Sequence, residues 1–196
     1  MSIDAEKTSN MHSNDFNSAS AAPYDCHDDN LESVRAPDKL AIKIWVDGSF
    51  QSKGRASGVG IVVTDIDNNL LEEHSITSKG PASSFDSELM SAVIALNLPS
   101  VLNSTVIELH GDCTSVIDFL NAPKEHYAFE EKSEARRNLA DDAREALCMH
   151  EDIIISHDSD RQTDKAGKLM RRAHFLAKCA LQNKPLTKCK FLNGPV

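Results

Sequence analysis

The stretch IKIWVDGS at residues 42–49 decides the fold expected for this chain. Ile42, Ile44 and Val46 alternate with other residues, which is the period of a β-strand with one buried face. Asp47 then lies on the opposite face of the strand. The sequence therefore predicts a half-buried strand that carries a carboxylate where its hydrophobic alternation ends.

Two further strands are expected directly after this one. The glycine- and serine-containing residues 48–57 predict a loop, and residues 58–64 predict a second strand. Turn-forming residues at 65–69 separate it from a third strand at 70–77, which we expect to be antiparallel.

A helix begins near Ser83 or Ser84, because Ser83 and Asp86 have the spacing of an N-terminal cap, and Pro99 ends it. Residues 105–110 predict a fourth strand. This strand is expected beside the first, since a helical crossover connects parallel strands.

The rest of the chain predicts three helices and a short strand. The helices are expected at residues 114–121, 132–149 and 164–181, and a short, fully buried strand at 153–155. The predicted order is β-β-β-α-β-α-α-β-α, which places the chain in the α/β class.

Charge is distributed unevenly along the 196 residues, whose net charge is -9. Residues 1–40 hold eight acidic and three basic side chains and little apolar periodicity, so we expect a disordered acidic N-terminal tail. Residues 165–190 hold eight basic side chains and no acidic one. We expect one domain at residues 41–181 and a basic C-terminal tail at 182–196.

Composition narrows the class of protein further. The chain is 40% hydrophobic and 26% charged, and it contains no apolar run long enough to span a bilayer. Its five cysteines are widely spaced and form no C-x-x-C pair, so we expect neither a disulfide framework nor a zinc site. A cytoplasmic location is the expectation that fits this cysteine pattern.

Four acidic residues occur where the predicted strands and helices meet: Asp47, Glu88, Asp112 and Asp164. In a sheet with the fourth strand beside the first, Asp47 and Asp112 would project to the same side, and the crossing helix would bring Glu88 near them. Carboxylates gathered in one place repel each other unless cations neutralise them. Mg²⁺ or Mn²⁺, which prefer oxygen ligands, are the expected partners.

These motifs resemble those of the ribonuclease H family of the bacterial and retroviral type. The matching pieces are WVDGS at 45–49, GVG at 58–60, SELMSA at 87–92, HGD at 110–112, SH at 156–157 and TDKA at 163–166. The resemblance covers about 140 residues. It implies a ribonuclease H-like fold, with a five-stranded mixed sheet of three antiparallel and then two parallel strands, flanked by helices.

The resemblance also implies a catalytic set and a mechanism. Two metal ions about 3.5 to 4 Å apart would hydrolyse the phosphodiester. Asp47 would bridge both Mg²⁺ ions, with Mn²⁺ as a substitute, Glu88 and Asp112 would hold one, and Asp164 the other. His157 matches the mobile histidine of the family, which assists proton transfer or product departure. Asp160 is the alternative to Asp164 as the fourth carboxylate.

The implied reaction is endonucleolytic cleavage of the RNA strand of an RNA-DNA hybrid, which leaves a 5′-phosphate and a 3′-hydroxyl. The chain has six polar or basic residues that we expect to contact the nucleic acid. They are Ser49, Ser83, Ser84, Lys165, Lys168 and Arg172.

Two alternatives remain open at this point. The first is a different nuclease on the same fold, acting on DNA or on single strands. The second is a nucleic-acid-binding or protein-binding module with little turnover, for which the acidic tail would be a flexible protein-binding segment. The sequence leaves the oligomeric state unknown.

Overall fold

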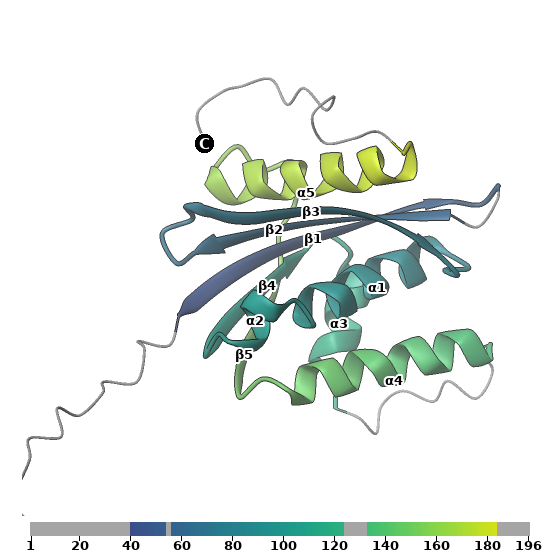
Figure 1. Ribbon diagram of the computed structural model, residues 1–196, viewed down its shortest axis with the longest axis horizontal. Helices are drawn as coiled ribbons and strands as arrows, with labels where there is room; N and C mark the ends of the chain where they lie inside the picture. Colours follow the sequence, from purple (N-terminus) through teal and green to yellow (C-terminus); the bar gives the residue numbers. More distant parts are fainter. Residues whose placement is uncertain (1–39, 54–55, 124–132, 184–196) are drawn as a thin grey trace, which may run out of the picture. The chain divides into compact units, whose positions relative to one another are not determined.

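A computed structural model gives the structure of the chain and describes residues 40–53, 56–123 and 133–183 (Figure 1). The two expected tails, apart from residues 40, 182 and 183, lie outside the described residues. The strands are β1 (Ala41–Gln51), β2 (Ala56–Asp65), β3 (Leu70–Lys79), β4 (Val106–Gly111) and β5 (Asp152–His157). The helices are α1 (Ser84–Leu96), α2 (Pro99–Leu102), α3 (Thr114–Asn121), α4 (Glu134–Cys148) and α5 (Lys165–Leu181).

The five strands form one mixed sheet in the order β3-β2-β1-β4-β5. Strand β2 is antiparallel to β1 and β3, whereas β4 is parallel to β1 and β5. This is the predicted arrangement of three antiparallel and then two parallel strands. The first strand is central because its hydrophobic residues are buried on both faces, as the 0% exposure of Ile44 and the 1% exposure of Trp45 indicate.

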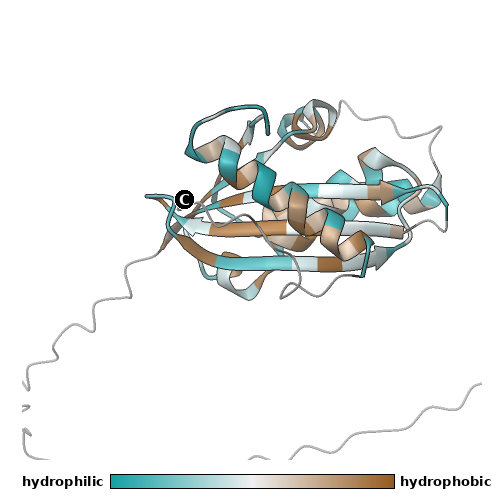
Figure 2. Ribbon diagram, turned by 90° about the horizontal axis from the view of Figure 1, so that it is seen from above, coloured by the Kyte–Doolittle hydropathy of each residue, from teal (hydrophilic) through white to brown (hydrophobic). Residues whose placement is uncertain are grey.

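Helix α5 covers one face of the sheet, and α1, α3 and α4 lie on the other (Figure 1). The larger core contains Ile44, Ile61 and Leu109 from the sheet together with residues of α1 and α4. A smaller core joins Trp45 and Val62 to α5. Figure 2, which looks down on α5, shows hydrophobic and hydrophilic stretches alternating along it, as a helix with one buried face requires.

Glycines permit two helices to touch the backbone of the sheet. A Cβ atom at Gly60 of β2 would overlap the carbonyl oxygen of Ala173 in α5. A Cβ atom at Gly48 of β1 would overlap the carbonyl of Ser87 in α1 and would lie 2.5 Å from the backbone nitrogen of Glu88. Both helices are therefore placed by direct contact with the backbone of the central strands.

Several predicted boundaries were wrong. Strand β1 continues to Gln51 through the first four residues of the segment predicted as a loop, because it pairs with β2 as far as Ala56. Strand β5 is not fully buried, since it lies at the edge of the sheet and Ile154 is 55% exposed. Pro99 not only follows α1 but begins the short helix α2, where its missing N–H costs no hydrogen bond.

Two further observations concern membrane-spanning helices and disulfide bonds. Within the described residues, no helix is long and apolar enough to cross a membrane. Cys179 is disulfide-bonded, which the wide spacing of the cysteines did not predict.

Candidate metal centre

Three carboxylates from different elements meet at one edge of the sheet. Asp47 lies in β1, Glu88 in α1 and Asp112 directly after β4, and ligand oxygens from all three lie within 4.8 Å of one another. Parallel pairing of β1 with β4 places Val46 opposite Gly111. The residues that follow, Asp47 and Asp112, are therefore neighbours.

The carboxylate of Asp47 is at the centre of this group and is 2% exposed. Its Oδ1 atom accepts a hydrogen bond from Nδ1 of His174 at 3.0 Å, when that nitrogen carries the proton. Its Oδ2 atom is buried and has no hydrogen-bond partner among the described residues. A buried carboxylate oxygen without a donor is costly unless a cation is bound to it.

The other two carboxylates, Glu88 and Asp112, have raised pKa values. Burial raises the pKa of Glu88 to about 9, with the charges of Asp47 and Asp112 adding to the effect, although the Gly48 amide donates to Glu88 Oε2 at 2.8 Å. Burial raises the pKa of Asp112, and Asp47 and Asp160 raise it further. Two carboxylates with raised pKa values, beside a third that has an unpaired buried oxygen, fit a hard divalent ion such as Mg²⁺ or Mn²⁺.

The structure does not bring Asp164 into this group. Asp164 is exposed and caps α5, with its Oδ1 accepting from the Gly167 amide at 2.9 Å. Asp160 lies in the loop between β5 and α5, near enough to Asp112 that its charge helps to raise the pKa of that residue. Of the two carboxylates considered from the sequence, Asp160 is thus the one with a described interaction with the cluster.

His157 ends β5 and lies beside the cluster. Its Nε2 atom is 3.1 Å from the backbone oxygen of Asp112, and the side chain is exposed. The imidazole of His157 is therefore accessible to solvent beside the carboxylates.

Sequence reasoning missed His174, which contacts Asp47 from α5. The hydrogen bond with Asp47 raises the pKa of His174, and burial of the ring opposes the shift. The structure explains this contact, because Gly60 pairs with Asp47 and packs closely against Ala173. The neighbour of Ala173 in α5 therefore comes close to the central carboxylate.

The loop after β5 is held at several points. Nδ1 of His110, whose ring stacks on Trp45, lies 2.7 Å from Asp158 Oδ2. Arg171 Nη1 donates to the backbone oxygens of Asp160 and Gln162, both at 2.6 Å. These contacts place Asp160 beside the end of β4.

A sequence-family model described as reverse transcriptase-like matches residues 45–173, more than half of the chain, and this range includes all three clustered carboxylates. The chain belongs to this ribonuclease H-type family. Comparison with curated protein sequences gives no match.

Solved structures confirm the ribonuclease H-like fold. The chain is similar to RNase H1 from the halophilic archaeon Halobacterium salinarum NRC-1, with 24% identity, a TM-score of 0.58 and coverage of 73% of this chain and 98% of that one. The N-terminal RNase H domain of rv2228c from Mycobacterium tuberculosis is 18% identical, with a TM-score of 0.56 and coverage of 74% and 99%. The foamy viral protease-reverse transcriptase in complex with an RNA/DNA hybrid is 17% identical, with a TM-score of 0.62 and coverage of 83% and 22%.

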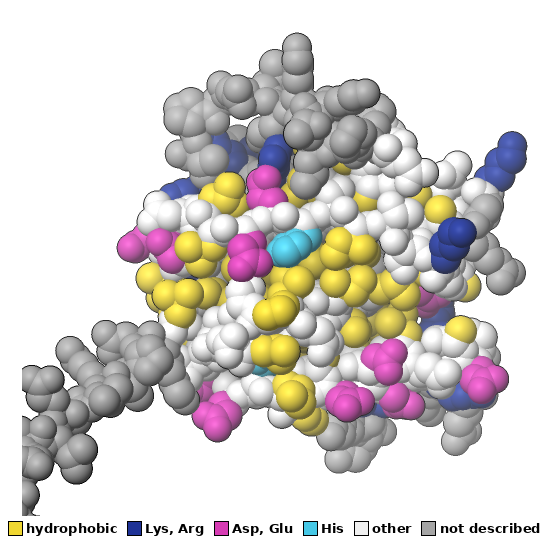
Figure 3. Space-filling model, in the orientation of Figure 1, with side chains coloured by type: hydrophobic (Ala, Val, Ile, Leu, Met, Phe, Trp, Pro, Cys, Tyr) yellow, Lys and Arg dark blue, Asp and Glu magenta, His cyan; other side chains and the backbone are white. Residues whose placement is uncertain are grey.

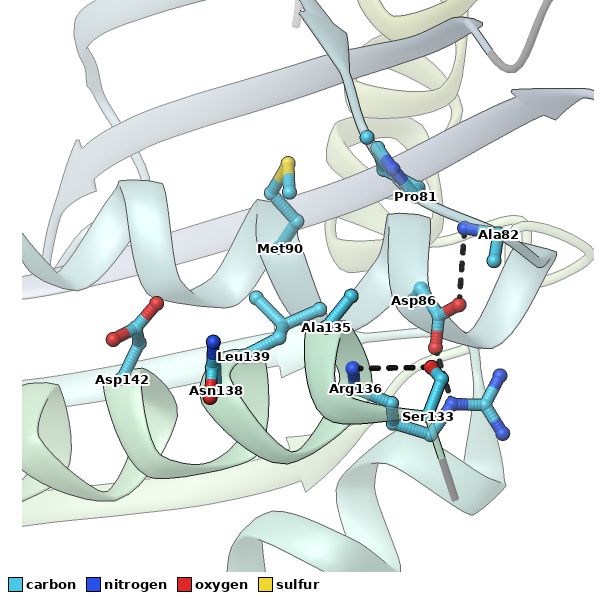
Figure 4. A pocket seen from close by; sticks show the side chains of 11 residues that line it. Pro81, Ala82, Asp86, Met90, Ser133, Ala135, Arg136, Asn138, Leu139 and Asp142 are labelled. Atoms are coloured by element: carbon cyan, nitrogen blue, oxygen red, sulfur yellow. Dashed lines mark hydrogen bonds and ion pairs between the residues drawn. The ribbon is translucent and has the colours of Figure 1, made fainter.

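The first turn of α1, which precedes Glu88, is fixed to α4 beside a pocket between the two helices (Figure 4). Arg136 Nε donates to Asp86 Oδ1 at 2.6 Å and its Nη2 donates to Ser83 Oγ at 2.7 Å. Burial would raise the pKa of Asp86, but its contacts with Arg136 and Ser83 and the Ala82 amide together lower it. The ionised Asp86 thus links α1 to Arg136 of α4, two residues before Glu88.

Some of the six residues expected to contact nucleic acid are already bonded within the protein, and others have exposed side chains. Ser83 caps α1, and Lys165 Nζ donates to the backbone oxygen of Asp67 at 2.9 Å. Arg172 forms a two-point ion pair with Glu73, at 2.5 and 2.6 Å. Of the remaining three side chains, those of Ser84 and Lys168 are exposed and that of Ser49 is half-buried.

The outer surface of α4 is acidic, as Figure 3 shows along that helix. Its exposed side chains include Glu134, Asp141, Asp142 and Glu145. Such a surface repels the phosphates of a nucleic acid.

Proposed function

We propose that this chain is a divalent-metal-dependent nuclease that hydrolyses the RNA strand of RNA-DNA hybrids. The observation that carries the proposal is the meeting of Asp47, Glu88 and Asp112, with ligand oxygens within 4.8 Å, around a buried Asp47 Oδ2 that has no described hydrogen-bond donor. Membership of the reverse transcriptase-like family supports it.

When bound, a pair of Mg²⁺ ions supplies a positioned water, neutralises charge on the phosphoryl oxygens and stabilises the leaving oxygen, which gives a 5′-phosphate and a 3′-hydroxyl. Asp47 would contribute to both ions, and Glu88 and Asp112 would hold the first. Asp164 was the fourth carboxylate expected from the sequence, and Asp160 is favoured by its interaction with Asp112.

His157 would give a proton to the leaving oxygen or receive one from the departing product at an imidazole nitrogen. Its exposed ring beside Asp112 supports this role. An imidazole is suited to it because it can gain or lose a proton near neutral pH.

The preference for a hybrid would come from contacts to 2′-hydroxyls and to the backbone. The hydroxyl of Ser84 and the ammonium of Lys168 are exposed and are the first candidates for these contacts. A structural relative that contains a hybrid supports this substrate, although another foamy viral complex contains dsDNA.

A second candidate function is nucleic-acid binding with little turnover. It is favoured by one observation, that Asp164 caps α5 outside the three-carboxylate cluster.

The deciding experiment compares cleavage of an RNA-DNA hybrid, duplex DNA, duplex RNA and single strands, each with Mg²⁺ and with EDTA. We expect Mg²⁺-dependent cuts within the RNA strand of the hybrid, with 5′-phosphate ends. Asp47→Asn is the matched inactive control. Hybrid binding without cleavage would support the second candidate, and preferential cutting of DNA would contradict the proposed substrate.

A further inference from the structure

The two oxygens of the Asp47 carboxylate have different surroundings. Oδ1 lies 3.0 Å from His174 Nδ1, whereas Oδ2 is buried without a hydrogen-bond partner among the described residues. A carboxylate can bridge two ions by giving one oxygen to each. In this structure one of those two positions is taken by an imidazole.

The position of His174 is fixed by the packing of α5 on β2. A Cβ at Gly60 would overlap the Ala173 carbonyl oxygen, and a Cβ at Gly58 would overlap that of Ala177. The helix backbone therefore lies against the strand on both sides of His174. A change of the His174 side-chain rotamer, without movement of the helix, would release the imidazole from Asp47.

Among the described residues, no fourth carboxylate belongs to the group of ligand atoms within 4.8 Å of one another, and Asp160, the favoured candidate, acts on Asp112. The possible metal-binding group consists of Asp47, Glu88 and Asp112. Asp164, at the start of the same helix as His174, is bonded to the Gly167 amide. The described side chains thus favour one ion on the Glu88 side of Asp47 and offer a histidine on the α5 side.

We propose that His174 competes with the second divalent ion for Oδ1 of Asp47. The inference rests on the proposed metal-dependent function and concerns the regulation of the same site. The first ion binds to the three carboxylates while His174 stays in place. The second ion binds more weakly, because it has to displace the imidazole from Asp47.

The test is a Mn²⁺ titration of the full chain, in which electron paramagnetic resonance measures free Mn²⁺. The wild type should bind one ion tightly and a second ion at least about tenfold more weakly. His174→Ala should tighten binding of the second ion by about tenfold to a hundredfold, the range expected when a hydrogen bond to a charged group no longer has to be broken. Affinity for the first ion should change less.

Two further variants make the result specific. His174→Asn keeps a neutral donor near the place of Nδ1 and should give a second-ion affinity between those of the wild type and His174→Ala. His74→Ala, which removes an imidazole paired with Glu72 on β3, should leave both affinities unchanged. Circular dichroism without metal confirms that each variant is folded.

A second-ion affinity that is equal in the wild type and His174→Ala, or weaker in the variant, overturns the inference, as does the absence of a second ion in both proteins. Failure of the proposed function is distinguishable. In that case the wild type binds no Mn²⁺ at all, or Asp47→Asn binds Mn²⁺ as well as the wild type.

Discussion

Replacement of Asp47 by Asn should abolish Mg²⁺-dependent cleavage without destabilising the metal-free protein. The pKa of Glu88 is raised from 4.5 to about 9, so keeping this group ionised at pH 7 costs about 3 kcal/mol. Burial is the largest cause and Asp47 the second. Glu88 is therefore protonated at pH 7 in the metal-free protein, and the relief from removing the Asp47 charge falls mainly on Asp112, where it should be on the order of 1 kcal/mol.

The substitution also weakens one favourable contact. Loss of the charged partner of His174 should cost about 1 kcal/mol, since that imidazole is partly solvent-exposed. The two effects nearly cancel. The free energy of unfolding in EDTA should be unchanged or higher by about 1 kcal/mol, which for a domain of this size raises Tm by at most about 4 °C.

Thermal unfolding followed by circular dichroism, with EDTA and with Mg²⁺, tests this prediction alongside the cleavage assay. Mg²⁺ at about one hundred times its Kd should stabilise the wild type by about 2.7 kcal/mol and leave Asp47→Asn unaffected, which reverses their order. The reasoning is refuted if the variant is clearly less stable than the wild type in EDTA, or if it retains Mg²⁺-dependent activity.

Four further predictions concern neighbouring residues. Because the folded-state pKa of Glu88 is raised, the stabilising contribution of this group is complete below pH 4.5 and is lost as the pH rises toward about 9. Glu88→Gln in EDTA should therefore gain stability relative to the wild type over that interval, and urea unfolding at each pH measures the difference. Gly48→Ala should lower the free energy of unfolding by about 2 kcal/mol, because a Cβ there overlaps the backbone of α1, and unchanged unfolding curves would contradict this contact. His157→Ala should slow turnover on the order of tenfold to a hundredfold while Mn²⁺ binding persists, and an unchanged kcat from pH 6 to 9 would argue against a role in proton transfer. Asp160→Asn should reduce kcat more than Asp164→Asn, and the opposite ranking would restore Asp164 as the fourth carboxylate.

Local sequence patterns were sufficient to predict the sheet and the three-carboxylate cluster. The alternation of Ile42, Ile44 and Val46 identified the first strand, although it wrongly predicted only one buried face, and the helical crossover required the fourth strand to lie parallel to it. Once those two strands are neighbours, the proximity of Asp47 and Asp112 follows from strand geometry alone.

The contacts of α5 could not be predicted in the same way. Whether His174 reaches Asp47 depends on how the helix is rotated and on how far it is shifted along the sheet, and neither quantity is visible in a helical hydrophobic pattern. The same limitation applies to Arg172, which was expected to bind nucleic acid but forms an ion pair with Glu73 on β3. The exposure of Ile154 was missed because a short apolar strand has the same sequence signature at the centre and at the edge of a sheet.

Gly58 contacts Ala177 and Gly60 contacts Ala173, so two residues of β2 correspond to four residues of α5. Two residues along a strand advance by about 6.7 Å, and four residues along a helix advance by about 6 Å. The two small-residue pairs therefore coincide only when the helix is in one longitudinal register. A shift by one turn would place Leu169 over Gly60 or Leu181 over Gly58, and it would carry the imidazole about 5.4 Å away from the carboxylate. The spacing of the two glycines in β2 thus determines the register of α5, and with it which residue of that helix reaches the metal site.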